Sequence, residues 1–493
     1  MSETPREDIP SQVKEELRVR GFNVDSDNVV SWLEDAPLHP KNWPLARKLY
    51  DTAAIAAFVT VSAMIGNGGN TIALKAAADL GLSNLQSNVV FAAVFYYSQA
   101  IGSLVIPPYS ETFGRKQTNL IASLGLAAMC AICSIDSVVA VASGRSISGF
   151  LTAMPAVVGA GSVEDMWSIR ARIWALDIWM KGAIVGIALG PCYATFISTS
   201  DLRWPWVFRP GAVLLAASSM SFVWTKESRP NRIMQQQLAI VAKTTGYKQL
   251  VPDSTDAVPT LQGFVTTMMV RPVKMFFTEP IVCTVSIMSG TVYASVFLLT
   301  PGQTVAYEAF GYNERKASLV FLAWVVGLML TIPLRVLDWR LGSRAVRSHT
   351  AVTPEDKITG FFIAAPVLAC SMWWWSWTVP PSSATLSSWI SIAALVFVGA
   401  CVNEFDGVLA GYLVDSYTTY AASANAPLAF LRALLSGSFP LFGRQLYEGL
   451  GSNVSGSIVA SVATIFVLIA LWFWAYGPHI RQRSPIASTV SKE

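Results

Sequence analysis

The sequence predicts an all-α integral membrane protein in which twelve transmembrane helices form two six-helix bundles. Three observations carry this prediction: the apolar composition, the number of long apolar runs, and one polar stretch that divides those runs into two equal groups. Of the 493 residues, 53% are hydrophobic and only 13% are charged. Soluble domains carry about a quarter charged residues, so a soluble protein of this composition would present surfaces too apolar to stay in solution.

Each apolar run is long enough to cross a bilayer, because a spanning helix needs about 20 predominantly apolar residues. The runs lie near residues 50–72, 88–108, 118–137, 139–162, 174–198, 204–226, 280–301, 317–338, 358–379, 387–412, 423–446 and 455–477. Grouping them six and six predicts an N-terminal bundle at 50–226, a central loop at 227–279 and a C-terminal bundle at 280–477. Residues 1–49 and 478–493 are then terminal tails, and the mixed charges of residues 1–30 predict disorder there.

Lysine and arginine predict the orientation of the spans, because cytoplasmic loops carry an excess of both. One set of span ends is rich in basic residues: Arg47, Lys48, Arg115, Lys116, Arg170, Arg172, Lys226, Arg229, Lys274, Arg340, Arg344, Arg347, Arg481 and Arg483. The opposite loops hold fewer: Lys75, Arg203, Arg209, Arg315 and Lys316. This bias predicts that both termini and the central loop are cytoplasmic. Asn453 starts an Asn-Val-Ser sequon on the opposite side and is a glycosylation candidate, with a chance match as the alternative.

The same sequence argues against several classes of function. The six cysteines all lie inside apolar segments, and the Cys130-x-x-Cys133 pair has no second pair or histidine cluster, so we expect neither a disulfide framework nor a metal site. No G-x-x-x-x-G-K-[ST] motif is present, which argues against an ATPase. Without a nucleophile, metal cluster or catalytic dyad in the sequence, we expect no enzyme activity and no cofactor.

The fifth span, WALDIWMKGAIVGIALGPCYATFIST, has features that a simple membrane anchor does not need. Gly182, Gly186 and Gly190 are four residues apart and therefore lie on one helix face, where small residues let a neighbouring helix approach closely. Pro191 removes a backbone hydrogen bond and favours a bend. A bent, closely packed helix of this kind is typical of proteins that move a solute.

Charged residues inside spans are costly and normally face a partner or a water-filled cavity. Asp177 and Lys181 are four residues apart, so they either pair and neutralise each other or lie at the headgroup level. Arg145, followed one turn later by Gly149, either faces the interior or extends to the outer interface.

A second pair of acidic residues lies in the tenth span, where Glu404 and Asp406 are two positions apart. This spacing points them to different sides of the helix, so we expect one to face the cavity. A carboxylate that is protonated from one side and deprotonated on the other can couple transport to a proton gradient. The alternative is a structural pair with Arg432 or Asn403.

The loop between the second and third spans reads Pro108-Tyr-Ser-Glu111-Thr-Phe-Gly114-Arg115-Lys116. It predicts a tight turn in which Gly114 adopts a positive φ. Glu111 would accept hydrogen bonds from a helix N-terminus or from Arg115, forming a charge cluster that can lock one state and release another. The alternative is that Arg115 and Lys116 only anchor the cytoplasmic side.

Polar and aromatic residues of the first, second, fifth, seventh and eighth spans form a candidate cavity wall. These residues are Asn67, Asn70, Tyr96, Gln99, Lys181, Tyr293, Gln303 and Trp324. Each can equally be an ordinary packing residue. Unpaired Arg145, Lys181 or Arg432 would favour anions, and unpaired Glu404 or Asp406 would favour cations.

Several of these motifs resemble those of the major facilitator superfamily. The Pro108–Lys116 loop resembles its signature loop, and the arginine–glycine spacing of the fourth span resembles a motif tied to proton coupling. The glycines and Pro191 of the fifth span resemble the antiporter motif, except that Ala194-Thr195 replaces its last two glycines. The block YLVDSYTTYAASANAPLAFLRALLSGSFPLF is similar to fungal twelve-span drug:proton antiporters.

The resemblance implies a monomeric, multi-pass transporter of the plasma membrane that exports a small organic compound by alternating access. The exported compound would be a secondary metabolite, toxin or drug, the proton gradient would be the energy source, and no nucleic acid would be bound. Glu404, Asp406, Asp177 and Arg145 are the proton-coupling candidates, and Asp415 and Arg432 join the conformational motifs. The incomplete antiporter motif leaves export or import open. A transporter of an organic acid or polyamine is one alternative, and a non-transporting receptor or scaffold is another.

Overall fold

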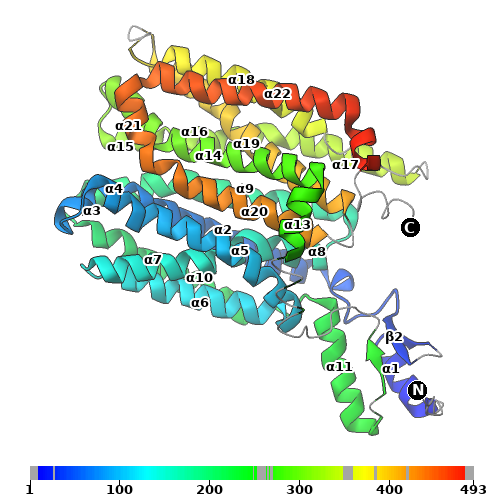
Figure 1. Ribbon diagram of the computed structural model, residues 1–493. Coiled ribbons are helices and arrows are strands. Elements are labelled where there is room, and N and C mark those ends of the chain that lie inside the picture. The colour runs from blue at the N-terminus through cyan, green and yellow to red at the C-terminus, as the bar shows by residue number, and fades with distance from the viewer. Residues whose placement is uncertain are drawn as a thin grey trace.

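Long helices running side by side make up most of the protein (Figure 1). The computed structural model describes residues 9–25, 28–247, 249–252, 263, 266, 270–347, 359–381, 386–417 and 421–483. The first long helix, α2, begins and the last, α22, ends at the same end of the molecule (Figure 1). We call this end the termini end and the opposite one the distal end.

The first bundle is built from the chain between α2 and η5. Its helices are α2 Leu45–Thr71, α3 Ala73–Asp79, α4 Asn84–Asn88, η2 Val89–Ala93, α5 Val94–Phe113, α6 Arg115–Cys133, α7 Val138–Ala153, η3 Met154–Val158, α8 Gly159–Met166, α9 Ile169–Ser198, η4 Trp204–Val207, α10 Phe208–Met220 and η5 Ser221–Val223. Several of these short elements continue one another, so that α4, η2 and α5 form one 30-residue span.

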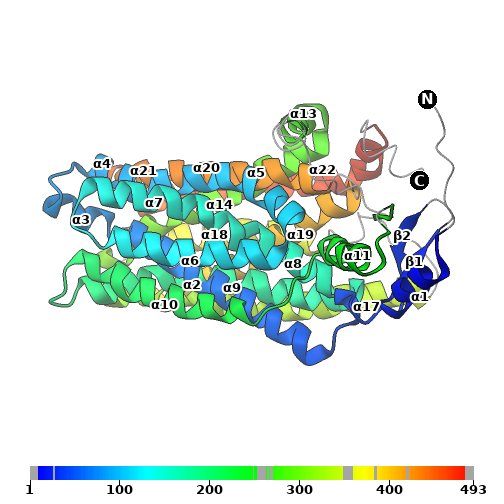
Figure 2. The ribbon, with the colours of Figure 1, turned by 90° about the horizontal axis from the view of Figure 1, so that it is seen from below.

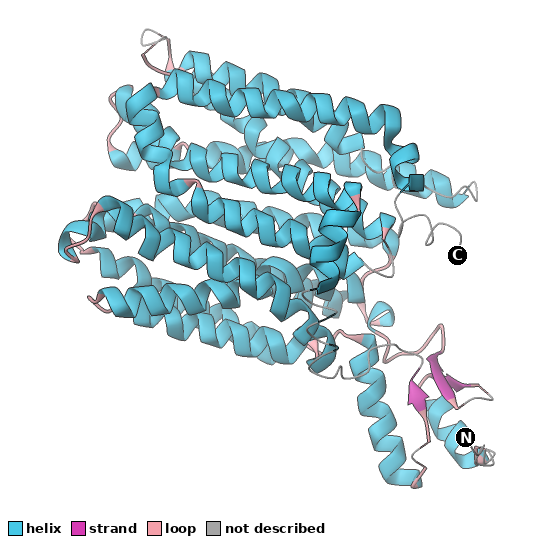
Figure 3. Cartoon of the chain, in the orientation of Figure 1, coloured by secondary structure: helices cyan, strands magenta, loops and turns pink. Residues whose placement is uncertain are grey.

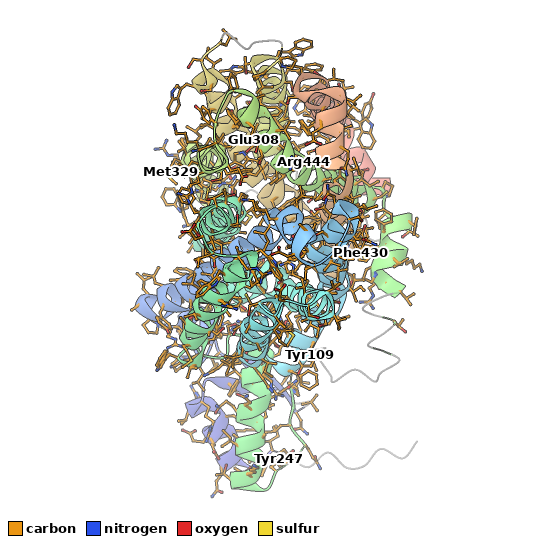
Figure 4. The ribbon with its side chains drawn as sticks, turned by 90° about the vertical axis from the view of Figure 1, so that its left-hand side faces the viewer. Tyr109, Tyr247, Glu308, Met329, Phe430 and Arg444 are labelled. Atoms are coloured by element: carbon orange, nitrogen blue, oxygen red, sulfur yellow. The ribbon has the colours of Figure 1, made fainter. Side chains whose placement is uncertain are left out.

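The second bundle begins after the central loop. Its helices are α13 Arg271–Thr278, α14 Pro280–Ala309, α15 Glu314–Leu319, α16 Leu322–Gly327, η7 Leu328–Thr331, α17 Ile332–Arg347, α18 Thr359–Thr378, α19 Ser388–Ser416, α20 Ala421–Ser438, α21 Pro440–Leu450 and α22 Ser452–Arg483. Many large apolar side chains of this bundle are exposed on its outside, as Met329 is, which lies on the outside in Figure 4 and is 55% exposed.

The spans match the pattern that the apolar runs predict. Within the described residues, ten helical segments are long and apolar enough to cross a membrane, and α20 with α21, bent by 49°, would be an eleventh. The helix α18 packs along α19 and α22 and accounts for the remaining run, although its three consecutive tryptophans lower its hydropathy. The predicted all-α membrane class is confirmed.

Each bundle has its own hydrophobic core, and α9 belongs to both. One core gathers residues of the first bundle and packs α9 on α2. The other gathers residues of the second bundle together with Ile184, Ala188 and Cys192 on the opposite side of α9. The fifth span therefore packs in both cores, and α5 also contacts the second bundle, through α20.

The N-terminal segment is folded, which corrects the expected disorder of residues 1–30 over the part that the structure describes. Here α1 Ser11–Val19, β1 Phe22–Val24, β2 Val29–Trp32 and η1 Pro40–Asn42 precede the first span, and α11 Pro230–Thr245 and β3 Val251–Pro252 come from the central loop. Strand β2 pairs antiparallel with β1 and parallel with β3. This small unit projects from the termini end (Figures 2 and 3).

Apolar residues of the two distant segments explain why the small unit folds. Val13 and Leu17 of α1 pack against Leu238 and Val241 of α11, and Phe22 joins them. Neither segment has enough apolar residues for a core of its own, so each alone has the composition of a disordered chain. Seen along the spans, Tyr247 of this unit lies beyond the first bundle and away from the second (Figure 4).

Candidate functional site

A cavity with an empty volume of about 860 Å³ lies between the two bundles. Small and aromatic residues make up most of its wall, with α2, α5 and α9 on one side and α14, α19 and α20 on the other. Four candidates from the sequence line it: Asn67, Tyr96, Gln99 and Tyr293. Asp406 and Arg432, expected in proton coupling and in a conformational motif, also line it.

Aromatic rings close part of this wall across the bundle boundary. Phe95 and Tyr96 of α5 cluster with Tyr293 and Phe297 of α14. The rings of Tyr96 and Phe297 meet edge to face, with centroids 4.8 Å apart, in a geometry that aromatic pairs favour. The cavity therefore offers flat apolar surface together with a hydroxyl group and neutral amides.

The wall of the cavity also contains an ion pair between Asp406 and Arg432. This pairing is the alternative to proton coupling that the sequence allowed for Asp406. Arg432 Nη1 of α20 lies 2.7 Å from Asp406 Oδ1 of α19. The hydroxyl of Tyr293 donates to the other carboxylate oxygen at 2.8 Å, and its ring lies 4.8 Å from the Arg432 guanidinium. Because each charge has a partner, the pair leaves the cavity wall neutral.

Glu404 points away from the cavity, into an ion-pair network between the bundles. It pairs with Arg335 of α17, a residue that the sequence analysis missed. Arg335 also lies 3.0 Å from Asp338 and 3.9 Å from Asp177 of α9, and Asp177 pairs with Lys181 at 2.5 Å. The network thus connects the fifth span to the eighth and tenth, on the termini side of the cavity.

The charges of this network do not balance. Among the side chains that the structure describes, it contains three carboxylates and two cations. Oδ1 of Asp177 and Oε1 of Glu404 are buried and accept no hydrogen bond from the described residues. Burying an uncompensated charge is expensive, and a carboxyl group can avoid the cost by taking up a proton. One proton would make the network neutral.

Arg145 is buried inside the first bundle, 2% exposed, and does not extend to the interface. Its guanidinium donates to the carbonyls of Phe91 and Gly66 at 2.7 and 2.9 Å and to Asn70 Oδ1 at 2.7 Å. It also lies 4.1 Å from the centre of the Phe95 ring. The residue therefore ties α7 to α2 and α5, and Asn70 is used in this contact outside the cavity wall.

The glycines of the fifth span face α2. A Cβ atom at Gly186 would lie 2.4 Å from the Thr60 carbonyl oxygen, and one at Gly190 would lie 2.8 Å from the Met64 carbonyl oxygen. Gly182 is similarly close to α2, with Ala56 O at 3.0 Å. The helix continues through Pro191 to Ser198 as one element.

The loop between α5 and α6 turns at Gly114, whose φ is +106°. Glu227, from the start of the central loop, accepts hydrogen bonds from the backbone nitrogens of Arg115 and Lys116 at 2.8 and 3.1 Å. A carboxylate at a helix N-terminus is stabilised by the unpaired N–H groups there. A Cβ at Gly114 would lie 2.4 Å from Glu227 Oε2, so both the turn and this contact require glycine.

The guanidinium of Arg115 lies closer to Asp165 than to Glu111, the partner expected from the sequence. Its Nε lies 3.1 Å from Asp165 of α8, whereas the nearest approach to Glu111 is 3.8 Å. The sequence motif therefore identified the arginine and the glycine, but Asp165 and Glu227 come from distant segments and carry no local signal.

Several predicted site residues lie elsewhere. Gln303 and Trp324 are buried within the second bundle and do not line the cavity, because they face other helices: Trp324 packs on Gly399 of α19. Lys181 is likewise absent from the wall and pairs with Asp177. The side chain of Asp415 lies outside the described residues.

The surroundings of the glycosylation candidate argue against a glycan. Asn453 is 7% exposed, and its Nδ2 donates to the carbonyls of Ser376 and Val379 at 2.6 and 2.9 Å. A glycan would have to be attached to this same nitrogen, so the folded structure leaves no room for it.

Comparisons with known proteins identify the family and the fold. A family model described as Major Facilitator Superfamily matches residues 56–440. "Efflux pump vrtL" of Penicillium aethiopicum is 27% identical over 480 residues, which cover 94% of this chain and 93% of that protein. "Cercosporin MFS transporter CTB4" of Cercospora nicotianae is 26% identical over 487 residues, covering 97% and 92%. The solved structure of the xylose transporter XylE from E. coli shares the fold at a TM-score of 0.56 and 16% identity, over 87% of this chain and 98% of that one.

Proposed function

The chain belongs to the major facilitator superfamily and is a multi-pass membrane transporter, and from this premise we propose that it exports a small neutral organic compound in exchange for protons. The observation that carries the proposal is the network of Asp177, Arg335 and Glu404, which joins the two bundles and has one carboxylate in excess. We place the protein in the plasma membrane by its resemblance to fungal exporters. The distribution of lysine and arginine favours cytoplasmic positions for both termini.

The proton would act through competition for Arg335. While Glu404 is ionised, it shares the guanidinium with Asp338 and holds it within the second bundle. Protonation of Glu404 removes one of the two competitors in the second bundle, so that Asp177 on the first bundle competes for Arg335 with Asp338 alone. The strength of the link between the bundles then depends on the proton, which is what lets a gradient bias their rocking.

The cavity supports a neutral, partly aromatic substrate. Arg432 and Asp406 are the charged residues among its described lining residues, and they neutralise each other. An organic acid or a polyamine would have to compete with one member of this partly buried pair for the other. The aromatic cluster and the amide of Gln99 instead favour a flat compound with a few hydrogen-bonding groups.

Export is supported by the relatives rather than by the cavity. One is named an efflux pump and another a cercosporin transporter, and the chain spans more than nine tenths of both. A receptor or scaffold that does not transport would gain no function from an uncompensated carboxylate between its bundles, and such a group lowers stability.

Purified protein in liposomes with an imposed pH gradient tests the proposal. A panel of neutral aromatic metabolites is compared with spermidine and citrate, and proton movement is followed with an internal pH-sensitive dye. We expect a neutral compound to accumulate against its gradient and to move protons in the opposite direction. Accumulation of spermidine or citrate alone, or no flux for any compound, would refute the proposal.

Variants then locate the coupling. Glu404→Gln should abolish accumulation driven by the pH gradient while leaving exchange of substrate across the membrane. Glu448→Gln is the matched control, since Glu448 forms an exposed pair with Arg444 on the same bundle. Normal accumulation by Glu404→Gln and by Asp177→Asn would show that the network does not carry the proton.

A further inference from the structure

The short helix α13 presents three distinct faces. With 100° per residue, one face is buried and comprises Pro272, Met275 and the partly buried Phe276. A second face is apolar yet exposed, with Val270, Val273 and Phe277 exposed by 54%, 55% and 79%. A third face carries the exposed Arg271, Lys274 and Thr278. The first of these faces is the one that is buried among the described residues.

The position of α13 explains what the other two faces can meet. The helix packs on α14 and α20 and runs across the direction of the spans at the termini end (Figure 1). In the second view it protrudes from the side of the bundle (Figure 2). Glu279 is the one residue that separates α13 from the membrane span α14. A helix that directly precedes a span and lies across it is at the depth of the lipid headgroups.

We propose that α13 lies in the headgroup layer of the membrane leaflet at the termini end and binds anionic lipid. Val273 and Phe277 would reach the upper part of the acyl chains, while Lys274 would contact phosphate groups. The segment from Arg271 to Thr278 has two basic residues and no acidic one, so a negatively charged surface is favoured.

The exposed apolar face indicates lipid rather than water as its surroundings. Phe277 is the most exposed of the large hydrophobic residues that the structure describes. It lies next to a basic face at an angle of about 100°, the arrangement by which amphipathic helices settle at a membrane surface. The function we infer is to fix the start of α14, the helix that carries Tyr293 into the cavity wall.

Spin labels at single cysteines test the depth of the two faces. Cys283 and Cys370 are replaced by serine, and labels are placed at 277 and 274 of the protein in vesicles of phosphatidylcholine and phosphatidylserine. Collision with oxygen reports lipid, and collision with a water-soluble nickel chelate reports water. Leu468 of α22, 62% exposed, is the lipid reference, and Lys243 of α11 is the aqueous reference.

We expect position 277 to behave as position 468 does, and position 274 to lie between the two references. If position 277 collides with the nickel chelate as strongly as position 243, the face is in water and the proposal is wrong. If position 277 is shielded from both reagents, a second copy or another segment of the chain covers the face, and the proposal is also wrong.

The preference for anionic lipid has its own test. A fluorophore at position 277 is quenched by spin-labelled phosphatidylserine or phosphatidylcholine, and the ratio measures the local enrichment. One basic residue near an anionic surface changes affinity by about fivefold at low salt, so Lys274→Gln should lower the ratio by up to that factor. Lys243→Gln is the matched control and should leave it unchanged. Equal quenching by both lipids in the unsubstituted protein would overturn the anionic preference.

Discussion

Replacing Gly186 by alanine should loosen the contact between α9 and α2. The new Cβ would lie 2.4 Å from the backbone oxygen of Thr60 and 2.7 Å from Ala63 Cβ, whereas ordinary contacts begin near 3.4 Å. Since the oxygen is part of the backbone, α2 must move by about 1 Å. Overpacking of this kind costs about 1–3 kcal/mol, and the higher helix propensity of alanine returns about 0.5–1 kcal/mol. We expect a net loss of about 1–2 kcal/mol.

The second bundle offers a matched control. Gly411 of α19 has nothing within 4 Å of its virtual Cβ, so Gly411→Ala should leave stability unchanged or raise it by about 0.5–1 kcal/mol. Thermal unfolding of the purified proteins in detergent, followed by tryptophan fluorescence, measures both. The Tm of Gly186→Ala should fall by about 1–2 °C, because the entropy of unfolding grows with chain length. Gly182→Ala should lose less, because its closest contact is the Thr60 side chain. A Tm of Gly186→Ala at or above that of Gly411→Ala would refute the reasoning.

Three further predictions concern other helices. Arg145→Lys should lower the Tm in the same assay, because an ammonium group cannot reach both carbonyls and the amide that the guanidinium contacts, and each lost charged hydrogen bond costs about 1.5–3 kcal/mol. Arg315 of α15 donates to Thr199 Oγ1 and O across the distal end at 2.7 and 2.9 Å. Arg315→Ala should therefore make a cysteine at position 199 react faster with a water-soluble maleimide. An unchanged rate would show that this contact does not hold the two bundles together at the distal end. Treatment with an endoglycosidase should leave the electrophoretic mobility of the protein unchanged, because the amide of Asn453 is buried. A mobility shift that disappears in Asn453→Gln would show that a glycan is attached there.

Local sequence determined the membrane class and most of the spans, because the length and hydropathy of a run are properties of neighbouring residues. It also identified the pairing of Asp177 with Lys181, which a spacing of four residues on a helix brings together. The positive φ of Gly114 belongs to the same group, since a tight turn needs a residue without a side chain.

Tertiary structure alone decided the partners of charges that meet between distant segments. Arg335 meets Glu404 and Asp177 because three helices far apart in the sequence converge at the bundle boundary, and no spacing within one helix reports that. The same holds for Glu227 at the N-terminus of α6, and for the folding of α1 on α11, where two polar segments make a core only together. It also separated Asp406, which lines the cavity, from Gln303, which does not, since polar residues in a span look alike until their neighbours are known.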